Sequence, residues 1–152
     1  MAVYEIVEVP SLILREKAKA VAKINAGVLR VLDNMKDSLY AANGVGLAAP
    51  QIGISKRIIV IDTTGEDYME FINPVILSRE GDQYGPEGCL SVPGVQGMVH
   101  RSQRVRVRAL NREGKEFVVT AEDLLARALQ HEIDHLDGIV FTQRADHLEN
   151  VK

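Results

Sequence analysis

The sequence predicts an α+β fold with a largely antiparallel sheet, and three observations support this class. Helical periodicity is strongest toward the two ends of the chain, at 25–42 and 120–138. The middle of the chain instead holds four runs typical of β-strands, at 56–62, 71–78, 104–110 and 115–121. The last two runs are joined through NREG, a connection typical of a β-hairpin. Runs of strands bracketed by helices favour the α+β class.

The length and charge of the chain narrow its class further. With 152 residues and 46% hydrophobic content, residues 1–152 fit one domain, which can bury roughly 70% of its unfolded surface. The formal net charge of -3 provides no basic field that would hold nucleic acid. In 104–108, arginines alternate with Val105 and Val107. This alternation indicates a strand with one solvated face rather than a functional basic patch.

The sequence also indicates a cellular compartment. Its one cysteine, Cys89, excludes an internal disulfide and suits a reducing environment. The N-terminus has no basic region followed by an apolar run, and no stretch approaches the length needed to span a membrane. We therefore expect a soluble, cytoplasmic protein without membrane association.

The helices of the first third are predicted from their starting signals. A short helix is expected after Pro10, from Ser11. A longer helix is expected from Asn25, a favourable N-cap residue, to about Ala42. Its apolar residues form one stripe, which indicates an amphipathic helix packed on the core. The residues of this stripe are Val28, Leu32, Met35 and Leu39.

The last strong helix is expected to begin at Thr120, because Thr120 and Asp123 form a T-x-x-D pattern that resembles a capping box. It is expected to end near Gly138. Its polar stripe consists of Arg127, Gln130, Asp134 and Asp137. Apolar residues cover most of the remaining circumference, so this helix is expected inside the domain.

This last helix carries the motif HEIDH. His131 and His135 are four residues apart, so their imidazoles project from one helix face and can share one ion. The chain has only four histidines, which makes a coincidental match a poor explanation. Two buried histidines without a metal would also each need a hydrogen-bond partner. The motif therefore predicts a metal site, with Glu132 placed to act as a general acid/base.

A catalytic metal needs a third protein ligand and a position open to water. The metzincin pattern would place that ligand at Phe141, which cannot bind a metal. A thermolysin-like site needs a glutamate well downstream, but Glu149 and His147 lie in a tail that we expect to fray. Cys89, in the stretch GPEGCLSVPG, is the soft donor available upstream. We therefore expect Cys89 to be the third ligand.

The glycine-rich stretch NGVGLAAPQIG follows the long helix. It satisfies a dinucleotide fingerprint only formally, because a helix precedes it where a strand is required and Pro50 hinders a following helix. No nucleotide cofactor is expected. Gly44 and Gly46 would instead let a substrate approach the backbone closely, and Gln51 offers a side-chain amide beyond them.

Together, GVGLAAPQ, EGCLS and QHEIDH, in this order and at this separation, resemble the three motifs of peptide deformylases. The similarity extends over nearly the whole chain. It implies mostly antiparallel sheets packed around a central metal-binding helix, in agreement with the α+β class. It also implies an enzyme that removes formate from the N-formylmethionine of nascent bacterial polypeptides.

The resemblance implies a role for each matching position. The metal ligands would be Cys89, His131 and His135. They would bind one divalent ion, Fe(II) first, with Zn, Ni or Co also possible. Glu132 would be the general acid/base, while Gln51 and the backbone N–H of Leu90 would polarise the formyl oxygen. The backbone positions that pair with the extended peptide would be Val45, Gly46 and Gly88.

Two features go beyond the shared motifs. In some relatives a longer C-terminal helix docks on the ribosome, so transient ribosome contact is an expectation, although this sequence ends at Lys152. Arg127 and Ala128 occupy positions near the family's methionine pocket. Two interpretations of Arg127 stay open. Its aliphatic stem lines that pocket while its charge stays in water, or it belongs to a solvated polar stripe.

Three other functions stay open on the residues alone. A small metalloprotease would cleave internal peptide bonds of unformylated peptides. A Cys-His hydrolase would use Cys89 as its nucleophile and need no metal. A non-catalytic metal-binding module would have a closed site with four ligands. Formate release from a formylated peptide, with and without a chelator, separates these functions.

Overall fold

The computed structural model describes residues 3–151 and confirms the α+β class. Its α-helices are α1 (Ala26–Ala41) and α2 (Asp123–Leu136), and its short 3-10 helices are η1 (Leu12–Arg15), η2 (Ala49–Ile52) and η3 (Phe141–Gln143). The strands are β1 (Gly46–Ala48), β2 (Ile58–Ile61), β3 (Met69–Glu80), β4 (Gln83–Cys89), β5 (Val92–Arg101), β6 (Arg104–Leu110), β7 (Glu116–Glu122) and β8 (His147–Asn150).

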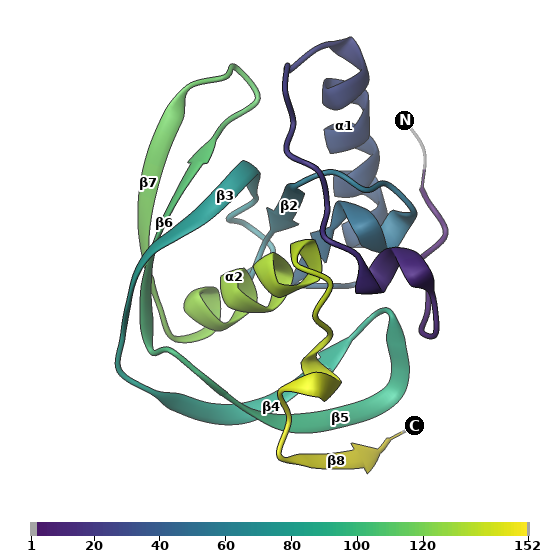
Figure 1. The fold of residues 1–152 in the computed structure, drawn as a ribbon, viewed down its shortest axis with the longest axis vertical. Helices are drawn as coiled ribbons and strands as arrows, with labels where there is room; N and C mark the ends of the chain where they lie inside the picture. Colours follow the sequence, from purple (N-terminus) through teal and green to yellow (C-terminus); the bar gives the residue numbers. More distant parts are fainter. Residues whose placement is uncertain (1–2, 152) are drawn as a thin grey trace.

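The strands form two antiparallel sheets around one helix. The larger sheet has the order β1-β2-β3-β6-β7, and the smaller has the order β4-β5-β8. Short connections from β3 to β4 and from β5 to β6 join the two sheets. Helix α2 lies between them and packs against strands of both (Figure 1). This is the predicted arrangement of antiparallel sheets around a central helix.

The four predicted strands are present as β2, β3, β6 and β7. The predicted hairpin is confirmed, with β6 and β7 paired from Arg104 opposite Glu122 to Leu110 opposite Glu116. Strands β4 and β5 had no clear alternating pattern and were not predicted. The expectation of a frayed tail is wrong, because β8 pairs with β5 from Met98 opposite His147 to Val95 opposite Asn150.

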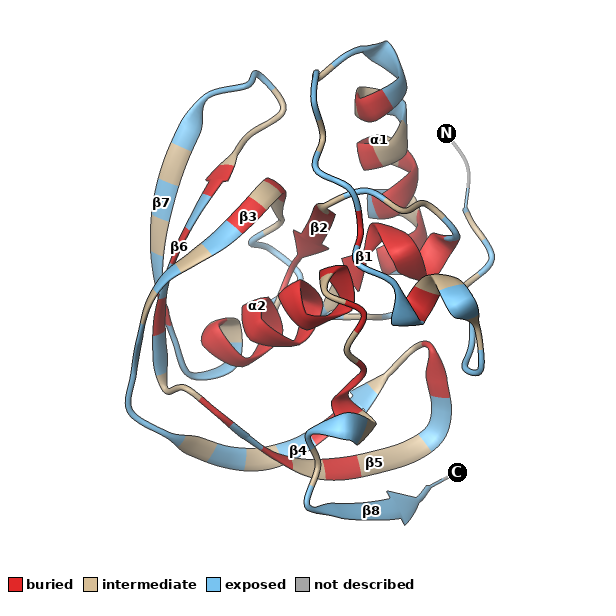
Figure 2. Ribbon diagram, viewed as in Figure 1, coloured by how far each residue is buried: buried red, intermediate tan, exposed pale blue. Residues whose placement is uncertain are grey.

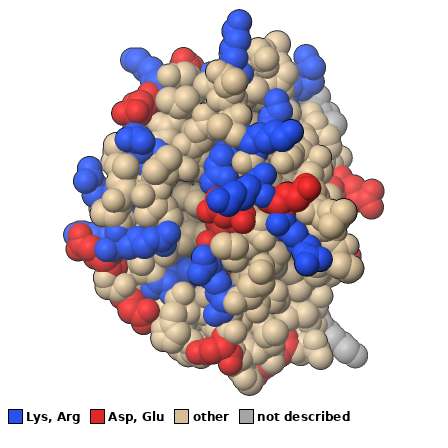
Figure 3. All heavy atoms as spheres, viewed as in Figure 1, with Lys and Arg blue, Asp and Glu red and all other residues tan. Residues whose placement is uncertain are grey.

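The surface charges agree with the interpretation of the arginines in β6. Residues of β6 alternate between exposed arginines and the buried Val105 and Val107. Arg104 forms an ion pair with Glu122 on the neighbouring strand at 2.6 Å. On the face drawn in Figure 3, Lys and Arg side chains are interspersed with Asp and Glu. These β6 arginines therefore lie on one solvated face of the sheet, as predicted.

The N-terminal helices match their predicted signals. The short helix after Pro10 is η1, a single 3-10 turn with Ser11 at its N-cap. Helix α1 begins directly after Asn25, whose side chain accepts a hydrogen bond from the Val28 N–H at 3.0 Å. The predicted stripe residues Val28, Leu32, Met35 and Leu39 are all buried. The local cap and the apolar stripe are thus sufficient to define α1.

The predicted start of α2 at Thr120 is wrong. Thr120 lies in β7 opposite Arg106, and α2 begins three residues later at Asp123. Its N-cap residue, Glu122, makes no side-chain capping hydrogen bond. The predicted end near Gly138 is confirmed. Gly138 has φ 76°, and a Cβ there would lie 2.6 Å from the carbonyl oxygen of Arg15, so the turn requires glycine.

Helix α2 is buried along nearly its whole length. Every residue of 126–136 is buried, including the charged ones (Figure 2). Asp134 accepts hydrogen bonds from Arg101 and Arg144, each at 2.5 Å. Asp134, on the predicted polar stripe of α2, is therefore paired with arginines from neighbouring elements and does not lie in water. Within residues 3–151, none of the helices is long and apolar enough to cross a membrane.

Candidate metal centre

Three predicted ligands meet on the inner face of α2. His131 and His135 lie one turn apart with ring centroids 5.2 Å from each other. Cys89, at the end of β4, places its Sγ 3.3 Å from His135 Nε2. One ligand atom from each of the three residues lies within 4.8 Å of the other two. A shift of register between Gly88 and Cys89 interrupts the β4–β5 pairing at this point, and such an irregularity can re-aim a side chain.

The donors fit a divalent transition metal. A thiolate and two imidazoles are the ligand types that Zn²⁺ and its first-row neighbours prefer. Three protein ligands leave a coordination position for water or substrate, which distinguishes a catalytic site from a closed structural one. The neighbouring Glu132 has a buried Oε1 without a hydrogen-bond partner among the described residues. Such an unpaired buried oxygen is costly unless a ligand or water satisfies it.

The two histidines have different electrostatic environments. Burial lowers the pKa of His135 to about 3, with further lowering by His131 and Arg101, so this imidazole is neutral. Burial also acts to lower the pKa of His131, but hydrogen bonds with Cys89 and Glu87 raise it to about 10. A metal that binds His131 must therefore displace a proton.

Glu87 is a site residue that the sequence did not reveal. Its Oε1 lies 2.8 Å from His131 Nδ1, which fixes the ring and directs Nε2 toward the ligand cluster. Burial acts to raise the pKa of Glu87, but hydrogen bonds from Arg101 and His131 hold it well below the usual range. Glu87 is thus a carboxylate that supports a metal ligand from behind. No spacing rule joins it to HEIDH, although it stands two residues before Cys89.

Glu132 is placed for proton transfer. Its side chain is buried, and burial raises its pKa to about 7, with Glu87 among the further contributors. A general acid/base works best when its pKa lies near the working pH. Gly46 makes this placement possible, because a Cβ at Gly46 would lie 2.7 Å from Glu132 Oε2. Gly46 therefore has a steric role at the site as well as the predicted role in substrate approach.

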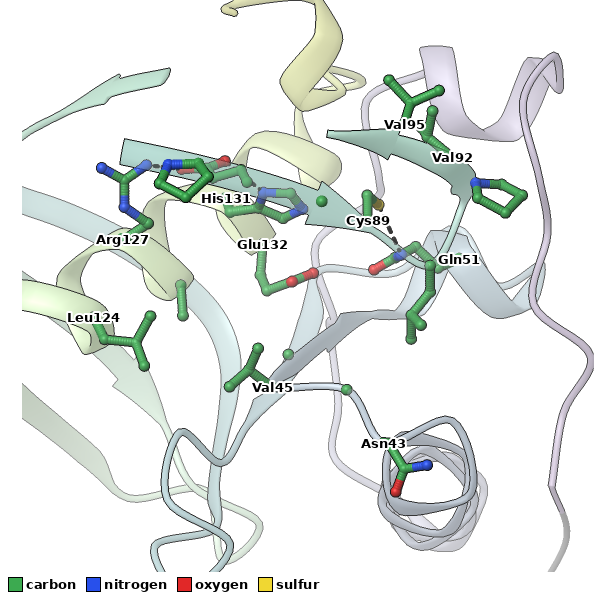
Figure 4. Close-up of a pocket in the computed structure, with 18 of the residues that line it drawn as sticks. Asn43, Val45, Gln51, Cys89, Val92, Val95, Leu124, Arg127, His131 and Glu132 are labelled. Carbon is green, nitrogen blue, oxygen red and sulfur yellow. Dashed lines mark hydrogen bonds and ion pairs between the residues drawn. The ribbon is translucent and has the colours of Figure 1, made fainter. Parts of the chain in front are cut away.

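Gln51 is buried and oriented by hydrogen bonds at both ends of its amide. Its Oε1 accepts from the Ala48 N–H at 2.9 Å, which fixes the direction of its NH₂ group. Its Nε2 lies 3.2 Å from Ser91 Oγ and 3.5 Å from Cys89 Sγ. The amide donor thus points to the metal cluster (Figure 4). Ser91, the fully buried serine of EGCLS, was not predicted as a partner of Gln51.

A cavity of about 400 Å³ opens in front of these groups. Figure 4 shows Glu132, Cys89 and Gln51 along one side of it and Val45 on the other. The predicted site residues that line it are Gly44, Val45, Gly46, Gln51, Gly88, Cys89, Leu90, His131 and Glu132. His135 is not among its lining residues, but its Nε2 lies 3.3 Å from Cys89 Sγ, which does line the cavity. The structure therefore brings every predicted site residue to the cavity or to the ligand cluster at its edge.

Arg127 corrects the sequence interpretation. The residue lines the cavity, as one of the two interpretations proposed. Its guanidinium, however, is buried and lies 2.6 Å from Glu87 Oε2. Both interpretations placed the charge in water, and both are wrong on this point. The sequence could not reveal the pairing, because the two residues are 40 positions apart.

The comparisons with known proteins agree with this geometry. A family model described as polypeptide deformylase matches residues 3–151. A peptide deformylase from Syntrophomonas wolfei is 61% identical over 145 residues, which cover 95% of this chain and 95% of that protein. A crystal structure of a peptide deformylase from Legionella pneumophila has a TM-score of 0.92 at 44% identity, covering 95% of this chain and 86% of that one. A crystal structure of the peptide deformylase from Thermotoga maritima has a TM-score of 0.92 at 36% identity, covering 95% of this chain and 98% of that one.

The fold, and the three candidate ligands that it brings together at α2, are those expected of a metal-dependent hydrolase. The match over residues 3–151 makes this class specific. The chain belongs to the peptide deformylase family, whose members remove the N-terminal formyl group from nascent polypeptides. The family, the enzymatic activity and the formylated nascent substrate predicted from the three motifs are thereby confirmed.

Proposed function

We propose that Cys89, His131 and His135 hold one divalent metal ion, at which this chain hydrolyses the formyl group of N-formylmethionyl peptides. The observation that supports this most directly is the meeting of the three ligand atoms within 4.8 Å beside the buried Glu132. Fe(II) is the metal that we propose for the native enzyme. Zn, Ni and Co suit the same donors, since first-row metals share these ligand preferences.

The chain's own residues supply the remaining chemistry. When held by Cys89, His131 and His135, a divalent ion would lower the pKa of a water molecule to about 7 and so make it available as the nucleophile. Glu132 accepts a proton from the attacking water and returns it to the departing amine. Gln51 Nε2 and the Leu90 N–H donate hydrogen bonds to the formyl oxygen as negative charge develops there. The hydrogen bond from Ala48 to Gln51 supports this role, because it fixes the amide before substrate binds.

Two sheet edges are available to pair with the backbone of the substrate peptide. Strands β1 and β4 are each at the edge of their sheet, and both border the cavity. We propose that the substrate binds as an extended strand between them, against Gly44, Val45 and Gly46 on one side and Gly88 on the other. Backbone recognition of this kind is independent of side chains beyond the first residue. It therefore suits an enzyme that must act on many different nascent chains.

The decisive experiment measures formate release from formyl-Met-Ala by the Fe(II)-loaded enzyme under anaerobic conditions. We expect turnover that a chelator abolishes and that re-added Fe(II) restores. Parallel loading with Zn, Ni or Co compares the candidate metals on one preparation. No formate release by fully metallated enzyme would contradict the proposal.

Three further measurements separate the rival functions. A metalloprotease would cleave a longer unformylated peptide, whereas we expect such a peptide to stay intact. A Cys-His hydrolase would keep its activity in chelator and form a covalent adduct at Cys89. A closed metal-binding module would show no exchangeable water in the absorption spectrum of its cobalt form. Any of these outcomes would replace the proposed mechanism.

The cellular setting belongs to the proposal as well. We propose that residues 1–152 act as one catalytic domain in the cytoplasm, where formylated chains emerge during synthesis. The free Cys89 supports this setting, because a ligand thiol must stay reduced. Transient contact with the ribosome follows from the substrate. Co-sedimentation of the enzyme with translating and with empty ribosomes tests this contact.

A further inference from the structure

The side chain of Arg127 lines the catalytic cavity, but its guanidinium points away from the cavity toward Glu87. Figure 4 shows Arg127 and Leu124 on the side of the cavity away from Gln51. The cavity lining is predominantly apolar on this side, with Leu124 and Ala128 on the same helix. The side chain of Arg127 is 10% exposed, so its guanidinium is almost completely removed from water. A buried charge of this kind requires partners that compensate for its lost hydration.

The partners of Arg127 come from both strands of the β4–β5 hairpin. Its Nη1 group lies 2.6 Å from Glu87 Oε2 and 3.2 Å from the Val99 carbonyl oxygen. A longer contact of 3.4 Å reaches the Gly85 carbonyl oxygen, and Nε donates to Gln83 Oε1 at 3.2 Å. Gly85 leaves the room for this head group, since a Cβ there would lie 3.3 Å from Arg127 Nη2.

Glu87 connects Arg127 to the metal centre. Its Oε2 accepts from Arg127 and from Arg101 Nε at 2.9 Å. Its Oε1 lies 2.8 Å from both His131 Nδ1 and Arg101 Nη2. The carboxylate is thus held by two arginines while it orients His131. Arg127 is the only one of these two arginines that lines the cavity.

We propose that Arg127 is a positioning residue that couples the pocket for the substrate's first side chain to the metal ligand His131. This inference rests on the proposed function and deepens it. The methylene stem forms a wall of the pocket, while the guanidinium holds Glu87 and, through it, the imidazole. Because Glu87 neutralises the guanidinium, the wall presents methylene groups and no free charge. The pocket therefore suits an uncharged, flexible side chain such as methionine.

Two substitutions separate the two roles of Arg127. The methylene stem is the wall of the pocket, and the guanidinium that holds Glu87 is the clamp. Arg127→Met keeps an unbranched apolar stem and removes the hydrogen bond from Arg127 to Glu87, while those from Arg101 remain. Arg127→Ala removes the stem as well. For both variants we expect metal affinity, measured by chelator competition with Zn²⁺, to fall about 10- to 100-fold, the usual cost of losing an outer partner of a metal ligand. The Zn²⁺ measurement needs no substrate, so it tests the clamp even if formate release fails.

Kinetics then tests the wall. With formyl-Met-Ala, we expect Arg127→Met to lower kcat per bound metal with KM changed less than about 3-fold. Arg127→Ala should in addition raise KM about 10-fold or more, as expected when an apolar pocket loses methylene groups from its wall. With formyl-Ala-Ala, whose first side chain does not reach the wall, the two variants should have the same KM.

A matched control and a conservative variant complete the test. Arg104→Met also removes an arginine from an ion pair with a glutamate, but in the exposed Arg104–Glu122 pair of the β6–β7 hairpin. It should leave Zn²⁺ affinity, kcat and KM within about 2-fold of the parent. Arg127→Lys keeps the stem and a positive charge and should recover part of the affinity for Zn²⁺. Unchanged Zn²⁺ affinity in folded Arg127→Met, or equal KM increases for both substrates in Arg127→Ala, would overturn the inference.

Discussion

The two α-helices of this protein are stabilised in different ways. Helix α1 has one buried stripe, an exposed opposite side, and a cap from its own Asn25. Helix α2 is buried from Ala126 to Leu136 on all sides, and its N-terminus has no side-chain cap. The first helix could be recognised from its own residues alone. The second depends on two sheets that surround it.

This difference separates stability from chemistry. Apart from Asn34 and Ser38, which are buried and hydrogen-bonded with Tyr4, the polar side chains of α1 have access to water, so the helix depends mainly on its cap and its apolar contacts. Polar side chains on α2 must find partners in the protein, and those partners hold the catalytic groups in place. Substitutions around α2 should therefore change metal binding or turnover. Substitutions in α1 should change the free energy of unfolding and leave turnover per folded molecule unchanged.

The largest effect is expected from Cys89→Ala, which removes the ligand that β4 brings to α2. Two imidazoles alone bind a divalent ion weakly. We expect metal affinity and activity to fall together by more than about 100-fold, beyond the usual cost of an outer partner. Metal analysis and formate release on one sample measure both quantities. Full activity in this variant would exclude Cys89 as a ligand.

The next effect concerns Glu132→Gln, which keeps the size of the side chain but cannot accept the proton. The metal should stay bound, and turnover should fall by about 10²- to 10⁴-fold with substrate affinity little changed. A residue that only supported the fold would instead lose metal or stability. A fully metallated and fully active variant would remove Glu132 from the mechanism.

Gln51→Leu tests the donor on the opposite side of the cavity from Arg127. The substitution keeps the approximate volume and removes the amide that faces Cys89 and Ser91. We expect turnover to fall by about 10²- to 10³-fold with metal retained, the usual cost of one oxyanion donor. Ser91→Ala, which leaves that donor in place, should cost much less. An effect of Gln51→Leu on KM alone would indicate a binding role.

The two helices also differ in how accurately their bounds could be predicted from the sequence. The bounds of α1 were predicted closely, because Asn25 and the apolar stripe act locally. The start of α2 was misplaced, because Thr120 carries a capping pattern but pairs with Arg106 in the sheet. The capping pattern covers only four residues, so it contains no information about a strand partner 14 residues away. Tertiary pairing thus overrode the local signal.

The site divides in the same way. His131, Glu132 and His135 were predicted because one helical turn fixes their relation. Their support was not predicted, since Glu87 contacts Arg101, Arg127 and His131 from 14, 40 and 44 residues away. An arginine on a helical polar stripe usually lies in water. Only the fold shows that the stripe of α2 faces other charges.

Leu32→Ala tests α1. Unlike the substitutions around α2, it should lower stability and leave turnover unchanged. Leu32 is fully buried in the cluster beneath the helix. Its truncation should lower the free energy of unfolding by about 3 kcal/mol, within the range for a leucine cavity. Turnover per folded, metallated molecule should stay the same. Arg30→Ala on the exposed side of the same helix is the control and should change neither quantity; a loss of turnover in Leu32→Ala would show that α1 also shapes the site.

The smallest effect is expected from Asn25→Ala, at the start of α1. The substitution removes the one side-chain acceptor for the Val28 N–H, whose bond to Asn25 Oδ1 measures 3.0 Å. Because Asn25 is exposed, water can partly replace that bond, so we expect the free energy of unfolding to fall by only about 1 kcal/mol. Asn25→Ser keeps a capping oxygen and should retain most of the stability, which separates capping from a general surface effect. Urea unfolding of the metallated proteins, followed by far-UV circular dichroism, measures the difference. Equal stability of the alanine and serine variants would mean that α1, like α2, owes its start to the surrounding fold rather than to its own cap.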